Sequence, residues 1–185
     1  MRLTKPRVEP LPEAEWTPEI RETLPRGVGG GRILAIFTTL ARHPKLLKRW
    51  LVFGNHVLFK STLGPREREL AILRIGYLCR SEYEWGQHAV IGRGVGLTDD
   101  EIHRVIAGPD APGWTELEAL VLRATDELHR DSMITDATWN ALSKHYGVEQ
   151  LMDLIFAVGQ YTLVSMALNS LGVQLDEGIE GFPRP

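Results

Sequence analysis

The chain has 185 residues, which suffices for one hydrophobic core and predicts a single domain over residues 1–185. Its formal net charge of -3 gives no electrostatic basis for binding nucleic acid or an anionic membrane, so we expect neither as a partner. Cys79 is the only cysteine, which excludes an intrachain disulfide. Because the first residues also form no apolar signal segment, we expect a cytoplasmic protein.

Helical spacing of apolar residues, together with capping residues and prolines, predicts an all-α fold of about nine helices. Residues 1–16 are rich in proline, and we expect an extended arm that wraps a neighbour or lies on the surface. The predicted helices cover residues 18–24, 32–43, 44–59, 65–79, 81–95, 98–108, 117–128, 135–146 and 148–171. No segment shows the sustained alternation that is typical of a strand.

One stretch of the last predicted helix has to be compared with a membrane-spanning helix. Residues 154–175 carry no charged side chain and are nominally long enough to cross a bilayer. Polar side chains such as Gln160, Ser165 and Asn169 interrupt the stretch, as do two glycines. We therefore interpret it as a buried helix of a soluble domain or oligomer.

Residues 63–106 hold the candidate functional residues, and Glu69 is the first of them. On a helical wheel Glu69 falls in the apolar arc beside Ile72 and Leu73, whereas the arginines of this helix lie mainly on other faces. A buried carboxylate is costly unless it is paired or protonated, so this placement indicates a functional group. The alternative is a first-turn glutamate stabilised by the helix dipole or by an ion pair with an arginine.

Glu84 and His88 lie one turn apart on the next predicted helix. The i,i+4 spacing allows the Glu84 carboxylate to orient the His88 imidazole and to raise its basicity. Two alternatives remain open: Ser81-x-x-Glu84 has the spacing of a capping box, and His88 is compatible with a core histidine bonded to a carbonyl. Together with Glu69, however, the pair favours a general acid/base site.

Cys79 ends the predicted fourth helix beside Arg80 and reads as a small buried hydrophobe, with thiol chemistry as the alternative. The remaining histidines lack metal-ligand spacing: His43, His56, His103, His129 and His145. A ferritin-like metal site would need a second Glu-x-x-His helix, which the sequence does not contain. We therefore expect no metal.

The three motif segments of this region resemble the carboxymuconolactone decarboxylase family, which includes the AhpD-like alkylhydroperoxidases. The matching residues are PRERELAIL at 65–73, EYEWGQH at 82–88 and GLTDDEI at 96–102. The resemblance implies an AhpD-like helical bundle that assembles into a homo-oligomer, a dimer, trimer or hexamer.

The chain departs from the hydroperoxidase branch, which carries a glutamate, a Cys-x-x-Cys pair and a histidine four residues after the second cysteine. Aligned on Glu69 and His88, the two cysteine positions hold Ser81 and Glu84, so dithiol peroxidase chemistry by that route is excluded. The decarboxylase branch carries a glutamate four residues before its histidine, as Glu84 and His88 do here. That branch works without a cofactor.

The preferred function is therefore carboxymuconolactone decarboxylase-like acid/base chemistry on a small organic acid or lactone, without a cofactor. In this hypothesis His88 is the general acid/base, Glu84 orients it and Glu69 completes the pocket. The neighbouring residues expected to line the substrate pocket are Ser81, Tyr83 and Trp85. One alternative is a peroxidase-like antioxidant relative that uses Cys79 or a partner's thiol. Another is a non-catalytic oligomer with a structural or small-molecule-binding role.

We also expect a homo-oligomer from the residues themselves. The ninth predicted helix is apolar over most of its circumference, and a domain of this size can bury few such helices completely. Tyr83 and Val90 lie on the outer side of the fifth predicted helix and would face water in a monomer. A neighbour that covers these surfaces would also roof the pocket.

Overall fold

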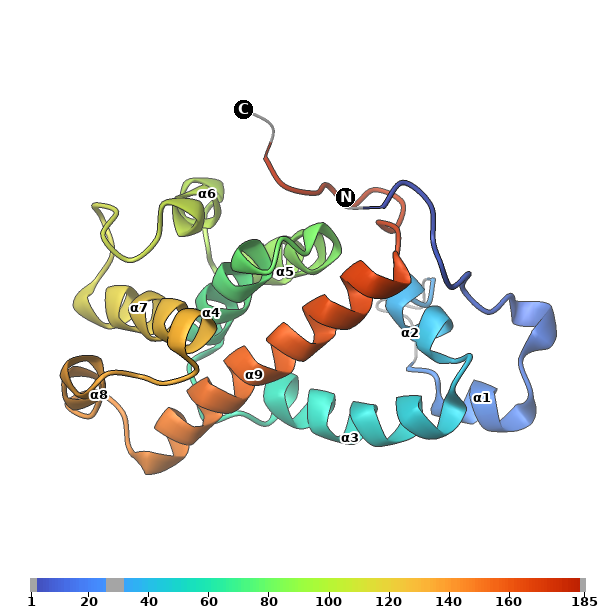
Figure 1. Ribbon diagram of the computed structural model, residues 1–185, viewed down its shortest axis with the longest axis horizontal. Helices are drawn as coiled ribbons and strands as arrows, with labels where there is room; N and C mark the ends of the chain where they lie inside the picture. Colours follow the sequence, from blue (N-terminus) through green and yellow to red (C-terminus); the bar gives the residue numbers. More distant parts are fainter. Residues whose placement is uncertain (1–2, 26–31, 184–185) are drawn as a thin grey trace.

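The computed structural model describes residues 3–25 and 32–183, and every regular element within them is helical. Figure 1 shows the arrangement of these elements. They are the 3-10 turn Glu13–Glu15 and the helices α1 (Pro18–Thr23), α2 (Ala35–Leu40), α3 (Pro44–Phe59), α4 (Pro65–Leu78), α5 (Glu82–Gly94), α6 (Asp99–Ala107), α7 (Glu116–Asp131), α8 (Asp136–Leu142) and α9 (Val148–Leu171). The predicted all-α class is confirmed.

Most helix boundaries follow local signals. Prolines occupy the first turn of α1, α3 and α4, where the missing N–H costs no helical hydrogen bond. Thr98 with Glu101 and Thr115 with Glu118 form capping boxes at the start of α6 and α7. These caps fix the starts of both helices where the sequence predicts them.

Helix α2 is shorter than predicted, because it begins at Ala35 and not near residue 32. The N-cap residue Leu34 has no side chain that can cap the helix. Instead, the Ala35 N–H donates to Asp176 Oδ1 at 3.0 Å, so the cap comes from the other end of the chain. Helix α8 also ends early, at Leu142, and residues 143–145 continue it only as turns.

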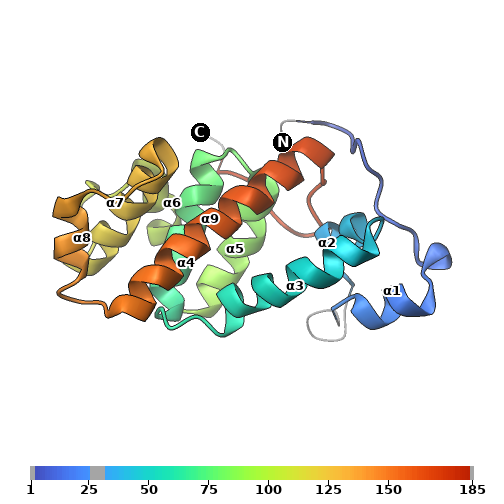
Figure 2. The same ribbon diagram turned by 60° about the horizontal axis from the view of Figure 1, so that its bottom comes forward.

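Helix α4 is the central element, packed against α5, α6, α7 and α9 (Figures 1 and 2). Residues 68–76 are all buried, which includes Arg68 and Arg74. The faces of α4 that carry these two arginines are therefore buried as well, because neighbouring helices cover them. Arg74 is accommodated by a bidentate pair with Asp126 of α7, at 2.6 and 2.9 Å, and by two carbonyls of α6.

Helices α1, α2 and α3 form a separate layer that packs on the rest through α3 and α9 (Figure 2). The N-terminal arm lies along the surface of its own chain. The Arg7 and Val8 N–H groups donate to the Leu171 carbonyl, and the Leu11 N–H donates to the Thr38 carbonyl. We expected the arm either to wrap a neighbour or to lie on the surface, and its described part lies on the surface of its own chain.

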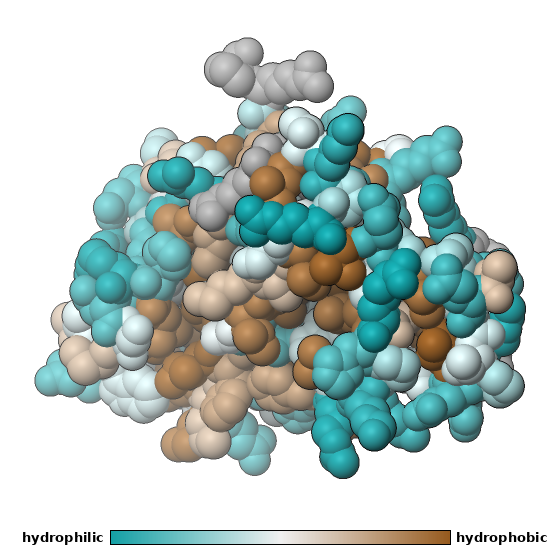
Figure 3. All heavy atoms as spheres, turned by 45° about the vertical axis from the view of Figure 1, so that its right-hand side comes forward, coloured by the Kyte–Doolittle hydropathy of each residue, from teal (hydrophilic) through white to brown (hydrophobic). Residues whose placement is uncertain are grey.

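Helix α9 is long and apolar enough to cross a membrane by length and composition. It packs on α3, α4, α5 and α7, and half of its most apolar window is buried. These contacts are those of a core helix. Its other face is exposed, and hydrophobic residues gather across the middle of the molecular face shown in Figure 3, with hydrophilic residues at its edges.

Candidate active site

A tight connection between α4 and α5 brings the candidate residues together. Arg80 adopts a left-handed conformation with φ 52°, and the Ser81 N–H donates to the Gly76 carbonyl at 2.8 Å. This turn folds α5 back along α4 with only three residues between the two helices. Glu69 on α4 therefore lies beside Glu84 and His88 on α5.

The three residues form a continuous chain of hydrogen-bonded groups. His88 Nδ1 lies 2.6 Å from Glu69 Oε2, and His88 Nε2 lies 3.0 Å from Glu84 Oε1. All three are buried, with exposed fractions of 0% for Glu69, 4% for Glu84 and 5% for His88. The predicted convergence of these residues is present.

The contacts of Glu84 and Glu69 bear on the alternatives left open for these two residues. Ser81 is the N-cap residue of α5, but its side chain makes no capping hydrogen bond, and Glu84 binds His88 instead. Glu69 does pair with an arginine, because Arg68 Nε lies 3.2 Å from Glu69 Oε1. The ion pair and the contact with His88 therefore coexist at the same carboxylate.

The charge state of His88 follows from its two carboxylate neighbours. Burial by itself lowers the pKa of His88, but the charge and hydrogen bond of Glu69, followed by those of Glu84, raise it to about 10. His88 is thus an imidazolium at neutral pH, with one N–H donated to each carboxylate. Neither ring nitrogen is left for a ligand.

A cavity of about 350 Å³ opens beside this group, a size suited to a small organic molecule. Glu84 and His88 lie in its wall, whereas Glu69 lies behind them and does not line it. Most of the remaining wall is apolar and comes from α2, α3, α5 and α9, with residues such as Ile36, Phe37, Trp50, Leu51, Leu58, Ile91 and Val164, and from Ile33 before α2. A water-poor cavity of this kind strengthens the electrostatic effect of the few polar groups in it.

The three predicted pocket residues occupy different places. Tyr83 lines the cavity, and it is buried, so its predicted position on an outer, neighbour-covered surface is wrong. Its hydroxyl instead donates to Asp176 Oδ2 at 2.6 Å. Trp85 packs in a second core cluster with Phe182, at a ring-centroid distance of 5.5 Å, and lines a separate surface hollow. Ser81 is buried outside the cavity, and its Oγ has no hydrogen-bond partner among the described residues.

The sequence analysis does not identify five further polar residues in the cavity wall, which are Asn55, Arg68, Gln87, Gln160 and Tyr161. The Tyr161 ring contacts His88 edge-on, with 4.8 Å between ring centroids. Burial, followed by the charges of Glu84 and Glu69, raises the pKa of Tyr161 well above its ordinary value, so it remains a neutral hydroxyl donor. In the sequence analysis, Gln160 is noted only as a polar residue that interrupts the uncharged stretch of residues 154–175.

Cys79 lies outside the cavity, at the other end of α4 from Glu69. Cys79 follows Glu69 by ten positions, a rise of about 15 Å along the helix. Its Sγ lies 4.0 Å from His129 Nδ1.

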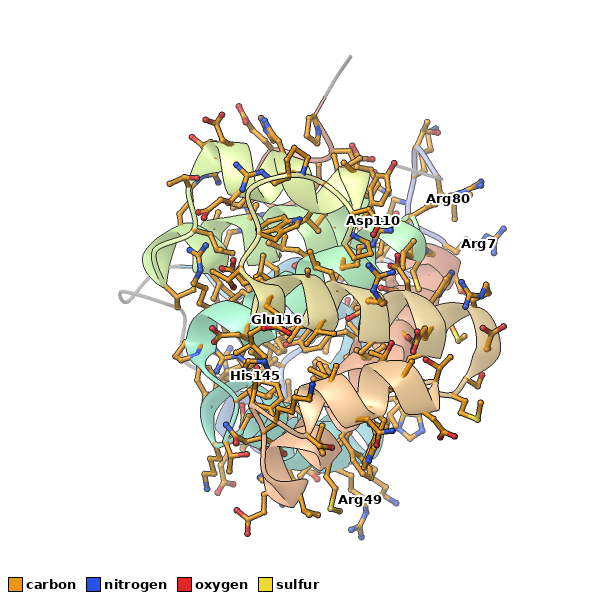
Figure 4. All side chains as sticks on the ribbon, turned by 90° about the vertical axis from the view of Figure 1, so that its left-hand side faces the viewer. Arg7, Arg49, Arg80, Asp110, Glu116 and His145 are labelled. Carbon is orange, nitrogen blue, oxygen red and sulfur yellow. The ribbon has the colours of Figure 1, made fainter. Side chains whose placement is uncertain are left out.

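Another histidine, His145, lies 3.8 Å from Glu116 on the face of the molecule formed by α7 and α8 (Figure 4). Within residues 3–25 and 32–183, no three potential ligand side chains are arranged to hold a metal ion.

Comparison with solved structures defines the fold class. A peroxidase-related protein from Ralstonia eutropha JMP134, described as an alkylhydroperoxidase AhpD core, has a TM-score of 0.82 and 19% identity, with 92% of each chain covered. A peroxidase-related protein from Silicibacter sp. TM1040 has a TM-score of 0.74 and 15% identity, with 95% of this chain and 92% of that chain covered. The fold is AhpD-like.

The same fold occurs in a cysteine-to-alanine variant of the debrominase Bmp8, in complex with 2,3,4-tribromopyrrole, with a TM-score of 0.77, 12% identity and 94% of each chain covered. No protein with a curated description matches the sequence. Residues 44–127 match the carboxymuconolactone decarboxylase family. The match to this family is confined to residues 44–127, and the likeness to the solved structures shows the AhpD-like fold.

Proposed function

We propose that this protein is a cofactor-independent acid/base enzyme of the carboxymuconolactone decarboxylase type, acting on a small organic acid or lactone. The observation that carries the proposal is the buried chain Glu84–His88–Glu69, which meets the apolar cavity at Glu84 and His88. Such a chain can hold and move a proton next to a ligand from which water is largely excluded.

Our proposal assigns the catalytic roles differently from the sequence-based hypothesis. Because both nitrogens of His88 are engaged by carboxylates, Glu84 is the group that exchanges a proton with the substrate. The His88 imidazolium holds the Glu84 side chain in place through the contact between Nε2 and Oε1. Glu69 keeps His88 protonated from behind, where no ligand reaches.

In a decarboxylation the bond between the substrate carbon and its carboxylate breaks, and carbon dioxide leaves. The electron pair stays on the substrate, delocalised into a conjugated carbonyl. The His88 imidazolium gives its Nε2 proton to the Glu84 carboxylate, which passes it to the substrate carbon and completes the product. A proton from water then returns through Glu84 to His88. The neutral Tyr161 hydroxyl in the same cavity can donate a hydrogen bond to the enolate oxygen that forms.

The test is a screen of unsaturated lactone carboxylic acids and 3-oxo acids in D₂O, with carbon dioxide release and deuterium incorporation as readouts. Glu84→Gln should reduce turnover by about 10²- to 10⁴-fold, the usual contribution of a general acid or base. Glu149→Gln, which changes an exposed first-turn glutamate of α9, is the matched control and should retain activity.

Full activity in the Glu84→Gln variant would contradict the proposal. A complete lack of turnover across the panel, combined with tight binding of its members, would instead indicate the non-catalytic binding function.

A further inference from the structure

We infer that the cavity binds a small monocarboxylate with an apolar body, and that Arg68 is the residue that binds its carboxylate. This inference rests on the proposed function and specifies its substrate class. It starts from a difference among the arginines of α4.

Two arginines of α4, Arg66 and Arg74, donate hydrogen bonds to other groups of the protein. Arg66 pairs with Glu118 and Glu101 and also donates to the Gly96 carbonyl. Arg74 uses Nε and Nη2 for Asp126 and Nη1 for two carbonyls. Both side chains therefore tie α4 to its neighbours.

Arg68 differs from both. It is buried, and its one hydrogen bond to the described residues runs from Nε to Glu69 Oε1 at 3.2 Å. The terminal nitrogens make no such bond within residues 3–25 and 32–183, although the side chain lines the cavity. Guanidinium donors that face a largely apolar cavity without an acceptor are unfavourable, and their planar arrangement matches the two oxygens of a carboxylate.

The charges around the cavity favour one carboxylate over two. His88 already shares its protons between Glu69 and Glu84, so Arg68 is the cation with donors left among the described residues of the wall. A second carboxylate on the ligand would face mainly apolar side chains and the Glu84 carboxylate. Leaving that charge unpaired in a largely apolar cavity is costly.

Gln160 provides an independent sign that the cavity receives a polar ligand. Its side chain is buried in the cavity wall, and its Oε1 atom has no hydrogen-bond partner in the described structure. An amide oxygen accepts a hydrogen bond, so the ligand carries a hydroxyl or N–H group in addition to its carboxylate. The apolar remainder of the ligand packs against α2 and α3.

The test measures binding by calorimetry and does not depend on turnover. The probes are 4-hydroxyphenylacetate, phenylacetate and the neutral 4-hydroxyphenylacetamide. The wild type should prefer the first probe. Arg68→Met should weaken binding of both carboxylates by about tenfold to a hundredfold and leave the amide unaffected, since charged hydrogen bonds are lost. Gln160→Leu should selectively remove the preference for the hydroxyl.

Two further variants keep the result interpretable. Arg68→Lys retains the charge beside Glu69, so it should fold as the wild type does and show an intermediate loss of carboxylate affinity. Arg123→Met, which changes a half-exposed arginine of α7, should bind every probe normally.

The inference is overturned if the wild type shows no preference for the carboxylates over the amide, including when it binds neither. It is also overturned if folded Arg68→Lys and Arg68→Met bind the carboxylates as the wild type does. Glu84→Gln separates this result from the proposed function: that variant should lose turnover and still bind the carboxylates. Binding of the carboxylate probes by a wild type that turns over no member of the lactone and 3-oxo acid panel would refute the proposed function alone.

Discussion

Glu69 Oε2 lies 2.6 Å from His88 Nδ1, while the other oxygen of the same fully buried carboxylate contacts Arg68. Glu69 is therefore a buried anion that two cations hold. Its position explains how His88 can remain charged in the interior, since burial alone would favour the neutral imidazole. The relationship links the protonation of His88 to the stability of the fold.

His88 should remain protonated in the folded protein up to a pH of about 10, compared with a pKa of about 6.5 in an unfolded chain. Because the folded-state pKa is raised, the folded state holds an extra proton between these values, so stability is full below pH 6.5 and falls as the pH rises towards 10. NMR of the imidazole nitrogens and urea unfolding across this range measure both effects. Glu69→Gln should lower the His88 pKa and flatten the decline, and an unchanged titration would contradict the pairing.

Arg74 should be one of the most important polar residues for stability. Arg74→Met leaves Asp126 without its partner and two carbonyls of α6 without their donor. We expect a loss of about 3–5 kcal/mol in the free energy of unfolding. Arg123→Met removes a largely exposed pair with Asp110 and should cost less than about 1 kcal/mol. Equal effects in urea unfolding would show that burial does not distinguish the two pairs.

The sequence predicts features whose causes are local. Caps and prolines fix the starts of helices such as α3, α4 and α6, and the wheel positions of Glu69, Glu84 and His88 identify the buried chain. In each case the signal lies within one or two turns of helix. Position 69 in particular combines an apolar arc with a carboxylate, which ordinary packing does not require.

The features that the sequence does not predict depend on distant contacts. The start of α2 is set by Asp176, which lies 141 residues away along the chain. Arg68 is placed in the cavity wall because α4 is covered on every side, which a wheel of that helix alone does not reveal. The hydroxyl of Tyr83 donates a hydrogen bond to the same Asp176, which holds this side chain in the interior. Periodicity assigns faces within one helix, but other helices decide which faces are covered.

The hydrogen bonds of Asp176 should hold α2 in place beside the cavity. It accepts hydrogen bonds from the Tyr83 hydroxyl, the Gln87 amide at 2.9 Å and the Ala35 N–H, and α2 supplies part of the cavity wall. Asp176→Asn should weaken these bonds and increase hydrogen exchange of the α2 amides by about tenfold, with no change in α7. Glu177→Gln is the matched control, because its exposed carboxylate makes only a 3.7 Å contact with Arg32. Unchanged exchange in α2 would mean that packing alone holds it.

Cys79 should have no part in the activity. Its thiol lies outside the cavity, and position 84 carries a carboxylate in place of a thiol. Cys79→Ser should therefore leave proton transfer unchanged. Neither the wild type nor this variant should reduce an alkyl hydroperoxide efficiently with a dithiol donor, as measured by peroxide consumption. Rapid peroxide turnover that disappears in Cys79→Ser would favour the antioxidant alternative.

The exposed face of α9 should mediate self-association. Met152, Phe156, Leu163 and Met166 are each more than half exposed, and their spacing of four, seven and three residues places them on one side of the helix. Gly159 lies in the same row with open space above it, which allows another helix to approach closely. A row of this kind is unfavourable in water and suits a second copy of the chain.

Sedimentation or light scattering at low micromolar concentration should therefore report a dimer, trimer or hexamer. Leu163→Glu places a charge in the middle of the exposed row on α9 and should shift the protein to a folded monomer, because an unpaired charge is costly inside an apolar interface. Met133→Glu is the control: Met133 is equally exposed but follows α7, outside the row, so this variant should keep the wild-type assembly. A wild-type monomer would refute the prediction, and an oligomer that survives Leu163→Glu would place the interface elsewhere.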